Sequence, residues 1–475
     1  MYHGSMNTLR FSLDRQGEQS LSEQIRSSIA EAIRQGHLYE GARLPSWRDL
    51  AAQLGVSRGT IKTAYDRLSD DQLVISKGAA GTFVSFVLPA APKVVAGASR
   101  LPLPDIYQDV DSAPKLFQVG VPAQEGFPFK HWSRIVLRCS RQAVAEPLRY
   151  PDPRGELVLR KEIAAYLAVA RGLLCSADQI IITNGYAGAL GLALHMLRLD
   201  SEQVWIEDPG YPLTRHALSL AGYTPVPVQV DDQGICVEQG IALAADARLA
   251  IVTPSQQAPL GVQLSLARRQ ALLAWAKANA GWIIEDDYLS ELQLSGQATP
   301  ALASLDREGR VIHIGTFSKT ISPRLRLGFM VVPMRLSERA GDTAAALSPA
   351  SALSSQLAVA EFLRDGHYLR HIRRMKRLYI QRRDALLALM GTSVSLNNMA
   401  GLSLLLTLAD DADDVHLAEA AKAFGLAPAP LSPWYATQIN ARKGLLLGVT
   451  NLSSPELEEG YQQLAALVAP HRQYQ

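Results

Sequence analysis

The chain reads Ile283-Ile284-Glu285-Asp286-Asp287-Tyr288, further on Gly315-Thr316-Phe317-Ser318-Lys319-Thr320, and then Arg326-Leu327-Gly328. Each half of this stretch begins on a short apolar run and ends on polar residues. This pattern predicts two buried strands that deliver polar groups at their carboxyl ends, where open α/β sheets place their ligands.

The polar groups of this stretch suit one cofactor. Lys319 can form a Schiff base with an aldehyde. Asp286, 33 residues earlier, can keep a pyridinium nitrogen protonated. A carboxylate is the usual partner of that nitrogen in pyridoxal phosphate enzymes. Arg326, seven residues after the lysine, can hold a phosphate through two hydrogen bonds. The sequence therefore predicts a site for pyridoxal 5'-phosphate (PLP), with Lys319 forming the internal aldimine.

These residues resemble the core of the fold-type I aminotransferases. With Glu207-Asp208-Pro209-Gly210-Tyr211 upstream, the chain is similar to the MocR branch of the GntR transcriptional regulators, and the resemblance covers about Ser20 to Gly460. In that branch an aminotransferase-like domain follows a small DNA-binding domain. The resemblance implies an α/β chain with an N-terminal winged helix-turn-helix domain and a fold-type I PLP-dependent aminotransferase-like domain built on a mostly parallel sheet.

Three parts are expected along the chain. They are a winged helix-turn-helix DNA-binding domain over 7–86, a linker over 87–115 and an aminotransferase-like PLP-binding effector domain over 116–475. A chain of 475 residues is too long for one ordinary core, which agrees with more than one domain. In the linker periodicity disappears and prolines recur, which is typical of an extended, semi-stiff connector.

The composition fits a folded protein outside membranes. Apolar residues make up 48% and charged residues 19% of the chain, and the formal net charge is +2, so any nucleic-acid surface must be local. No apolar run reaches the length of a membrane span, and no secretory signal opens the chain. The three cysteines have no metal-ligand spacing, so we expect no metal site, buried thiols and a reducing, cytoplasmic location.

The amino-terminal domain shows three helix signals. Ser20-Leu21-Ser22-Glu23 has the spacing of a capping box, and an apolar residue then recurs every four positions. A second helix is predicted from Ser46 to Gly55, and a third begins at Ser57, which together give helix-turn-helix spacing. Two short β segments, around 73–76 and 82–86, would follow as a wing.

The helix-turn-helix region carries the positive charge that DNA binding requires. From Arg43 to Arg67 there are five basic residues against two acidic ones. Arg58 stands near the start of the third helix, where helix-turn-helix proteins touch base edges. By resemblance to the GntR winged helix, the DNA contacts are Arg48, Ser57, Arg58, Thr60 and Lys62. The wing tip Gly78-Ala79-Ala80 lacks the basic or imidazole residue that the family often carries there.

The resemblance assigns further cofactor contacts in the large domain. Tyr150 would reach the phosphate of the other subunit's cofactor, which implies a homodimer with shared sites. The turn from a buried strand into a helix at Gly185 would offer free backbone N–H groups to the phosphate. Tyr211 would stack on the pyridine ring. The complete predicted set is Tyr150, Gly185, Tyr186, Ala187, Tyr211, Asp286, Tyr288, Thr316, Ser318, Lys319 and Arg326.

Three departures from the family pattern bear on function. MocR proteins usually carry two glutamines where Ala187 and Gly188 stand, so the backbone would be the phosphate donor. Ala258 replaces the asparagine that most aminotransferases use to bond the ring hydroxyl, which leaves Ser255 or Gln256 for that bond. The arginine that binds a substrate carboxylate has Leu446 at the matching place.

These observations favour a transcriptional regulator that binds operator DNA and responds to PLP, or to an amine or amino acid that displaces Lys319. The effector could be PLP itself or a compound resembling γ-aminobutyrate or taurine. The alternative is a PLP-dependent aminotransferase with an appended DNA-binding domain, which would leave Ser20 to Phe86 without a use. A third hypothesis is a DNA-binding protein whose large domain is only a scaffold that binds no ligand. Such a scaffold would have no physical need to keep Asp286, Lys319 and Arg326. We expect sensing instead of turnover.

Overall fold

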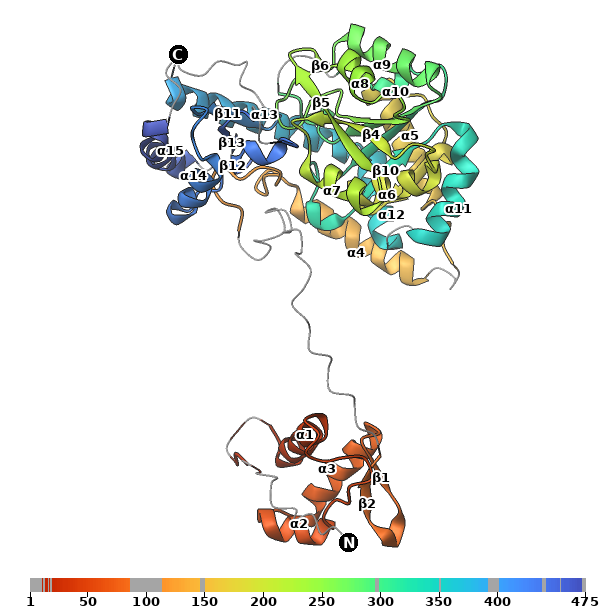
Figure 1. Cartoon of the computed structure of the whole chain (residues 1–475), viewed down its shortest axis with the longest axis vertical. Helices are drawn as coiled ribbons and strands as arrows, with labels where there is room; N and C mark the ends of the chain where they lie inside the picture. Colours follow the sequence, from red (N-terminus) through yellow and green to blue (C-terminus); the bar gives the residue numbers. More distant parts are fainter. Residues whose placement is uncertain are drawn as a thin grey trace. The chain divides into compact units, whose positions relative to one another are not determined.

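The computed structural model describes residues 11, 13–15, 17, 19–85, 113–145, 150–294, 299–349, 352–391, 401–437, 441–452 and 454–471. The chain divides into two compact units, Met1–Pro102 and Leu103–Gln475 (Figure 1). The predicted linker falls mostly on residues outside the described ranges. The predicted domain boundaries therefore stay predictions.

Three helices form the small unit: α1 (Leu21–Arg34), α2 (Trp47–Leu54) and α3 (Arg58–Asp70). Each begins where a serine hydroxyl accepts a backbone N–H three residues on. The donors are Glu23, Asp49 and Thr60, at 3.3, 3.2 and 3.1 Å. Such a cap stabilises a helix by roughly 1 kcal/mol. All three predicted helix starts are confirmed.

A short hairpin closes the small unit. Strands β1 (Val74–Ser76) and β2 (Thr82–Val84) pair antiparallel around the 3-10 turn η1 (Gly78–Ala80). Val74 and Val84 point into a core that they share with buried residues of all three helices: Ile25, Ile29, Ile33, Leu50, Ile61, Ala64 and Leu68. The predicted winged helix-turn-helix architecture is confirmed.

The large unit is built on an eight-stranded sheet of order β3-β10-β9-β8-β7-β4-β5-β6. The five strands from β9 to β5 run parallel, whereas β10 lies antiparallel between β3 and β9, and β6 is antiparallel to β5. A mostly parallel sheet is thereby confirmed. The strands are β3 (Ile180–Thr183), β4 (Gln203–Asp208), β5 (Thr224–Asp231), β6 (Gly234–Ile235), β7 (Leu249–Val252), β8 (Trp282–Asp287), β9 (Val311–Thr316) and β10 (Gly328–Val331).

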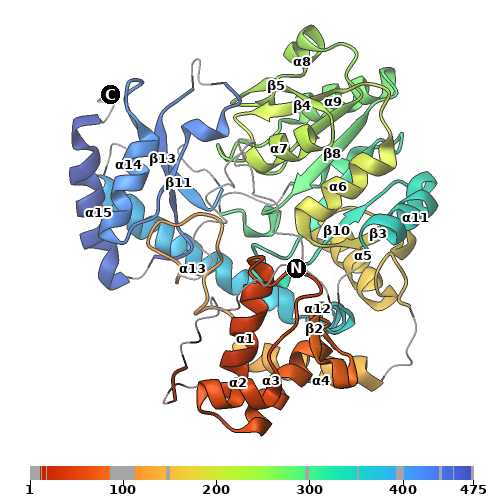
Figure 2. The same cartoon turned by 60° about the horizontal axis from the view of Figure 1, so that its bottom comes forward.

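Helices cover both faces of this sheet because successive strand residues point to opposite sides. Ile181 of β3 packs in the cluster that also holds α6 and α11, whereas Ile180 and Ile182 pack with α5 and α12. Figure 2 shows α6 beside β10, with α11 next to it. The helices of this part are α4 (Phe129–Ala145), α5 (Leu157–Arg171), α6 (Gly185–Leu197), α7 (Pro212–Leu220), α8 (Val237–Leu243), α9 (Leu266–Ala278), α10 (Leu302–Leu305), α11 (Ser337–Leu347) and α12 (Leu353–Arg364).

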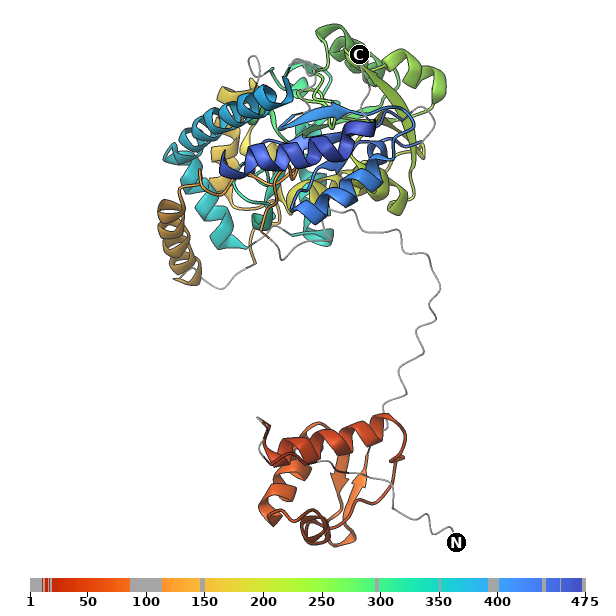
Figure 3. The same ribbon diagram turned by 90° about the vertical axis from the view of Figure 1, so that its left-hand side faces the viewer.

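A smaller antiparallel sheet follows in the same unit, with order β11-β13-β12. Its strands are β11 (Ser403–Thr407), β12 (Ala429–Pro430) and β13 (Gly444–Gly448). It is reached through the long helix α13 (His367–Met390) and is covered by α14 (Asp414–Ala421) and α15 (Ser454–Val468). Figure 3 shows α15, in dark blue, alongside α13.

Two expectations from composition can be compared with the structure. Within the described residues no helix is long and apolar enough to cross a membrane. The expectation of buried thiols is correct for Cys139 but wrong for Cys175 and Cys236, which are partly exposed. The difference arises because Cys175 follows the end of α5 and Cys236 precedes α8, so both lie in surface connections.

Candidate functional site

The predicted site residues meet because of the strand order at one end of the large sheet. β8 and β9 are parallel neighbours, with Asp286 paired to Ile314, so Asp286 and Lys319 leave the sheet side by side. The antiparallel strand β10 brings its own start to that same end, where Gly328 pairs with both Thr183 and Thr316. A residue that precedes β10 therefore lies beside residues that follow β3 and β9.

The charges of Lys319 and Asp286 act on each other. Burial lowers the pKa of the Lys319 amine below its ordinary value, and the Asp286 carboxylate partly opposes this. Burial, together with the neighbouring carboxylates Asp287 and Glu207, raises the pKa of Asp286 well above its usual range. The Lys319 Nζ atom donates a hydrogen bond of 2.8 Å to the carbonyl oxygen of Gly120. A lysine with a lowered pKa is more often the uncharged nucleophile that reacts with an aldehyde.

A second cluster lies at the start of helix α6. A Cβ atom added to Gly185, whose φ is +75°, would stand 3.8 Å from the guanidinium carbon of Arg326. Arg326 also donates to the carbonyl oxygen of Asn184 at 3.2 Å. A helix N-terminus offers free N–H groups and a positive dipole end, and here a guanidinium stands beside it. Two positive groups side by side suit a phosphate.

Hydroxyl groups lie along the same edge. Thr316 Oγ1 donates to Ser318 Oγ at 3.0 Å, and the Ser318 backbone N–H donates back to Thr316 at 3.2 Å. Tyr186 is hydrogen-bonded to Thr214 at 2.8 Å, whereas the side chain of Ala187 is exposed. Among the residues predicted for phosphate binding, Ala187 can contribute only its backbone.

Aromatic side chains lie near Asp286, whose charge acts on Tyr186 and Tyr288. The Tyr211 ring lies 6.2 Å from the Tyr186 ring and 5.8 Å from the Trp434 ring, measured between centroids. Tyr288 is half-buried, and burial raises the pKa of its hydroxyl. The Tyr288 hydroxyl and the Gln256 amide both lie near Gly401, at 3.6 and 3.8 Å from a Cβ atom placed there.

Unpaired polar atoms show that this space fits the cofactor. The buried Asp286 Oδ1 and Gln256 Oε1 atoms have no hydrogen-bond partner among the described residues. Because buried polar atoms are nearly always paired, two orphan acceptors in one site indicate a missing partner. A protonated pyridine nitrogen and a phenolic hydroxyl are such partners. Ser255, the other candidate for the ring hydroxyl, already accepts from Arg171 at 2.7 Å, so Gln256 is the better candidate.

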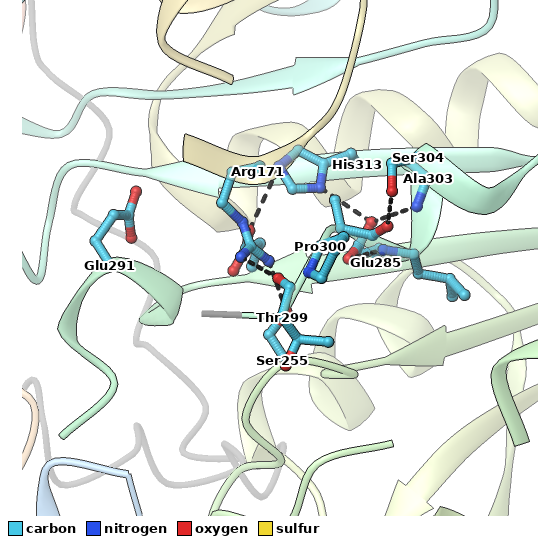
Figure 4. Close-up of polar contacts among 12 residues, drawn as sticks. Arg171, Ser255, Glu285, Glu291, Thr299, Pro300, Ala303, Ser304 and His313 are labelled. Carbon is cyan, nitrogen blue, oxygen red and sulfur yellow. Dashed lines mark hydrogen bonds and ion pairs between the residues drawn. The ribbon is translucent and has the colours of Figure 1, made fainter. Parts of the chain in front are cut away.

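A buried ionic network lies on the opposite face of β8, and the sequence analysis did not find it. Arg171 donates to Asp287 at 2.7 Å, and His313 lies 3.7 Å from Asp287 and 3.1 Å from Glu285 (Figure 4). Burial disfavours the charged imidazole, but the Glu285 carboxylate outweighs this and raises the pKa of His313. The only sequence signal was the alternation of Glu285, Asp286 and Asp287, which places the outer two away from Asp286.

The remaining predicted residues of the large unit take separate places. Tyr150 is fully exposed in the single chain, so its predicted contact with a partner's cofactor stays a prediction. Leu446 is buried in strand β13 at the position where an arginine was sought. Gly120 and Trp434 contact the site but carried no recognisable sequence signal.

The candidate DNA interface lies on α2 and α3 of the small unit. The side chains of Arg48, Arg58 and Lys62 are exposed, and the Lys62 amine lies 5.9 Å from the centre of the Trp47 ring. Ser57 and Thr60 are hydrogen-bonded to each other at 2.8 Å, so the predicted contact of Ser57 coincides with its role as helix cap. Arg67, in contrast, is ion-paired with Glu23 at 2.8 Å. The described contacts leave the start of the third helix positively charged.

The positively charged side chains of the wing lie beside its turn and not at its tip. The Arg43 guanidinium lies against Gly81, because a Cβ atom there would stand 2.9 Å from its Nε. The Lys77 amine lies over the Phe83 ring at 5.2 Å from its centre. Both side chains flank the turn Gly78–Ala80, so positive charge remains near the wing.

Comparisons with known proteins agree with this architecture. The model of bacterial regulatory proteins of the gntR family matches residues 21–84, and the model of aminotransferase class I and II matches residues 120–425. The probable rhizopine catabolism regulatory protein MocR of Rhizobium meliloti is 32% identical over 95% of this chain and 94% of its own. The HTH-type pyridoxine biosynthesis transcriptional regulator PdxR of Corynebacterium glutamicum is 34% identical over 77% of this chain and 76% of its own.

A solved structure gives the same picture for the large unit. Kynurenine aminotransferase of Pyrococcus horikoshii, crystallised in complex with PMP, superposes with a TM-score of 0.68 at 25% identity. The match covers 77% of this chain and 93% of that one. The aminotransferase class I and II fold is that of PLP-dependent proteins, so the large unit has a fold in which this cofactor is bound.

Proposed function

The chain belongs to the MocR branch of the GntR transcriptional regulators, and from this membership we propose how its two domains work. The small domain binds operator DNA, and the large domain senses PLP or a primary amine that reacts with it. A regulator of this kind acts on the chromosome, so we place it in the cytoplasm. We further propose a homodimer in which Tyr150 of each subunit reaches the other subunit's cofactor phosphate.

The observation that carries the proposal is that the charge of the buried Asp286 acts on Lys319 at the end of the sheet where the guanidinium of Arg326 lies at the start of α6. PLP, when bound, supplies an aldehyde that condenses with primary amines. Lys319 provides the amine, and Asp286 offers an unpaired oxygen to the ring nitrogen. Arg326 and the backbone at Gly185 would hold the phosphate, and the hydroxyls of Thr316 and Ser318 would support them.

The DNA-binding half rests on the small unit alone. Arg48, Arg58 and Lys62 are exposed on the two helices of a helix-turn-helix, and a cation at the start of the second of these can reach base edges. Phosphate contacts from such cations give affinity, and contacts to base edges give sequence preference. An aminotransferase would have no use for this arrangement.

Coupling between the domains has a thermodynamic signature. If PLP or an amine changes the affinity for DNA by some factor, DNA must change the affinity for that ligand by the same factor. The test measures both affinities with the full chain, on genomic fragments enriched by the wild-type protein. We expect the ligand to change the DNA affinity, and DNA to change the ligand affinity, by the same factor, and this factor should differ from one. A ligand that binds at the site and leaves DNA affinity unchanged contradicts the sensing role.

Attachment of the cofactor is tested with Lys319→Ala. The wild type should turn yellow with PLP, and borohydride reduction should leave a covalent adduct on the peptide that contains Lys319. Lys319→Ala should form neither the yellow species nor the adduct, whereas the exposed-surface control Lys161→Ala should behave like the wild type. A yellow adduct that survives in Lys319→Ala would show that another lysine carries the cofactor.

A further inference from the structure

The smaller sheet is apolar at the place where a carboxylate-binding arginine was expected. Leu446 is 2% exposed and forms a buried cluster with Leu405 and Leu431. The partly buried side chains that pack against this cluster are Val119, Leu260, Ala429, Trp434 and Tyr435. Leu446 is therefore a packed core residue and not an exposed leucine at the place of an arginine.

This cluster adjoins the reactive amine. Val119 directly precedes Gly120, whose carbonyl oxygen accepts the hydrogen bond from Lys319. Trp434 packs against the cluster and lies beside Tyr211, and its carbonyl oxygen accepts the Gly210 N–H at 3.0 Å. A molecule that brings an amine to the position of Lys319 Nζ would meet the partly exposed side chains around this cluster, such as Val119 and Trp434, with the rest of its body.

Two of the arginines nearest to this cluster are committed elsewhere. Arg171 is paired with Asp287 on the other face of β8, and Arg215 donates to the carbonyl oxygens of Trp434 and Pro433 at 2.7 and 2.8 Å. Arg326 stands at the phosphate end, and the exposed Arg442 lies close enough to Tyr435 for its charge to oppose the rise in the pKa of that phenol. Of the described charged groups, Asp286 is the one whose charge acts on Lys319.

An anionic group placed against the cluster of Leu405, Leu431 and Leu446 would therefore lose its water without gaining a cation from that part of the described wall. Burying a carboxylate unpaired is strongly unfavourable, whereas covering an aliphatic or aromatic body with Val119 and Trp434, which pack over Leu446, is favourable. We propose, on the basis of the function proposed above, that the effector is a primary amine with an aliphatic or aromatic body and no carboxylate or sulfonate. The exchange for Lys319 forms one C–N double bond and breaks one, and moves two hydrogens from the incoming amine to the lysine nitrogen, so it needs no oxidant or reductant.

Matched pairs of compounds test this selectivity. The full chain loaded with PLP is titrated with 2-phenylethylamine against phenylalanine and with 3-methylbutylamine against leucine, where each pair differs by one carboxylate. The visible spectrum and the DNA affinity are both recorded. The amine of each pair should act at a concentration at least about tenfold lower than its amino acid, and γ-aminobutyrate and taurine should be weak. Equal potency within the pairs would overturn the proposal.

Variants at Leu446 give the matched control. Leu446→Arg should shift the preference toward the amino acid of each pair, whereas Leu446→Met, which keeps the volume and the apolar character, should retain the preference of the wild type. If Leu446→Arg does not fold, the comparison of pairs in the wild type decides alone. A PLP-loaded spectrum that no amine shifts refutes this inference but leaves PLP itself as the signal. A chain that takes up no PLP refutes the proposed function.

Discussion

The Lys319 amine donates a hydrogen bond of 2.8 Å to the carbonyl oxygen of Gly120, which lies 199 residues earlier in the chain. Gly120 has a φ of +81°, and a Cβ atom added to it would stand 3.0 Å from the lysine nitrogen. The segment before α4 thus forms part of the site, and it holds the amine in a fixed place. Glycine is required there both for the backbone conformation and for the space.

Gly120→Ala should weaken the uptake of PLP. The methyl group would displace the lysine amine, and a non-glycine residue at this φ is strained by roughly 1–2 kcal/mol. We expect the dissociation constant of PLP, measured by absorbance, to rise about tenfold or more. Gly172→Ala is the control, since its φ of +63° imposes the same strain but its nearest side-chain contact is Pro300 at 3.9 Å. An unchanged constant in Gly120→Ala would remove this residue from the site.

Arg58→Ala should lower the affinity for the selected operator by about ten- to a hundredfold, the effect of one lost base contact, while PLP uptake stays at the wild-type level. The measurement is a fluorescence anisotropy titration at fixed salt concentration. Arg67→Ala removes the same charge from the same helix, but from a side chain that is ion-paired with Glu23. The recognition role of Arg58 fails if both variants bind alike.

Glu207 should make stability depend on pH. Burial raises the pKa of its carboxyl from 4.5 to about 7, although Thr253 and Gln257 donate hydrogen bonds to it. The folded protein therefore holds this proton more tightly than the unfolded chain. The contribution to stability is fully present below the unfolded pKa of 4.5 and is lost as the pH rises through about 7.

Glu207→Gln removes this titration. Between about pH 5 and pH 8 the wild type should lose up to roughly 3 kcal/mol of unfolding free energy relative to the variant. Urea unfolding at several pH values measures the difference. Glu202→Gln, at an exposed position before the same strand, should show no such trend. A difference between Glu207→Gln and the wild type that stays constant with pH would contradict the raised pKa.

The Arg171–Asp287 pair should be essential for the stability of the large unit. Both side chains are buried, and Arg171 also donates to Ser255 and to the carbonyl oxygen of Thr299. Arg171→Leu removes the arginine that faces the buried Asp287 charge and should cost roughly 3–5 kcal/mol of unfolding free energy in urea. Lys277→Ala breaks the exposed pair with Glu308 and should cost less than about 1 kcal/mol. Similar losses in the two variants would show that burial of the first pair has no energetic consequence.

Local patterns in the sequence were sufficient for some of the elements. Serine caps and apolar periodicity marked α1, α2 and α3, because a cap and a helical stripe involve residues only three or four positions apart. The apolar runs before Asp286 and Lys319 marked β8 and β9 for the same reason. The chemistry of Lys319, Asp286 and Arg326 and their resemblance to the fold-type I aminotransferase core brought them together as one set.

Contacts between distant segments were decided by the tertiary structure. The order of the sheet places β10 between β3 and β9, so Arg326 meets Asn184, 142 residues away, at the start of α6. The Arg171–Asp287 pair spans 116 residues, and no local pattern predicts it. The apolar packing around Leu446 combines segments that are equally remote. The sequence by itself determined the starts of α1, α2 and α3, the strands β8 and β9 and the chemistry that follows those two strands, since these depend on near neighbours. Only the tertiary structure decided which groups share a buried space, because strand order and packing set the distances there.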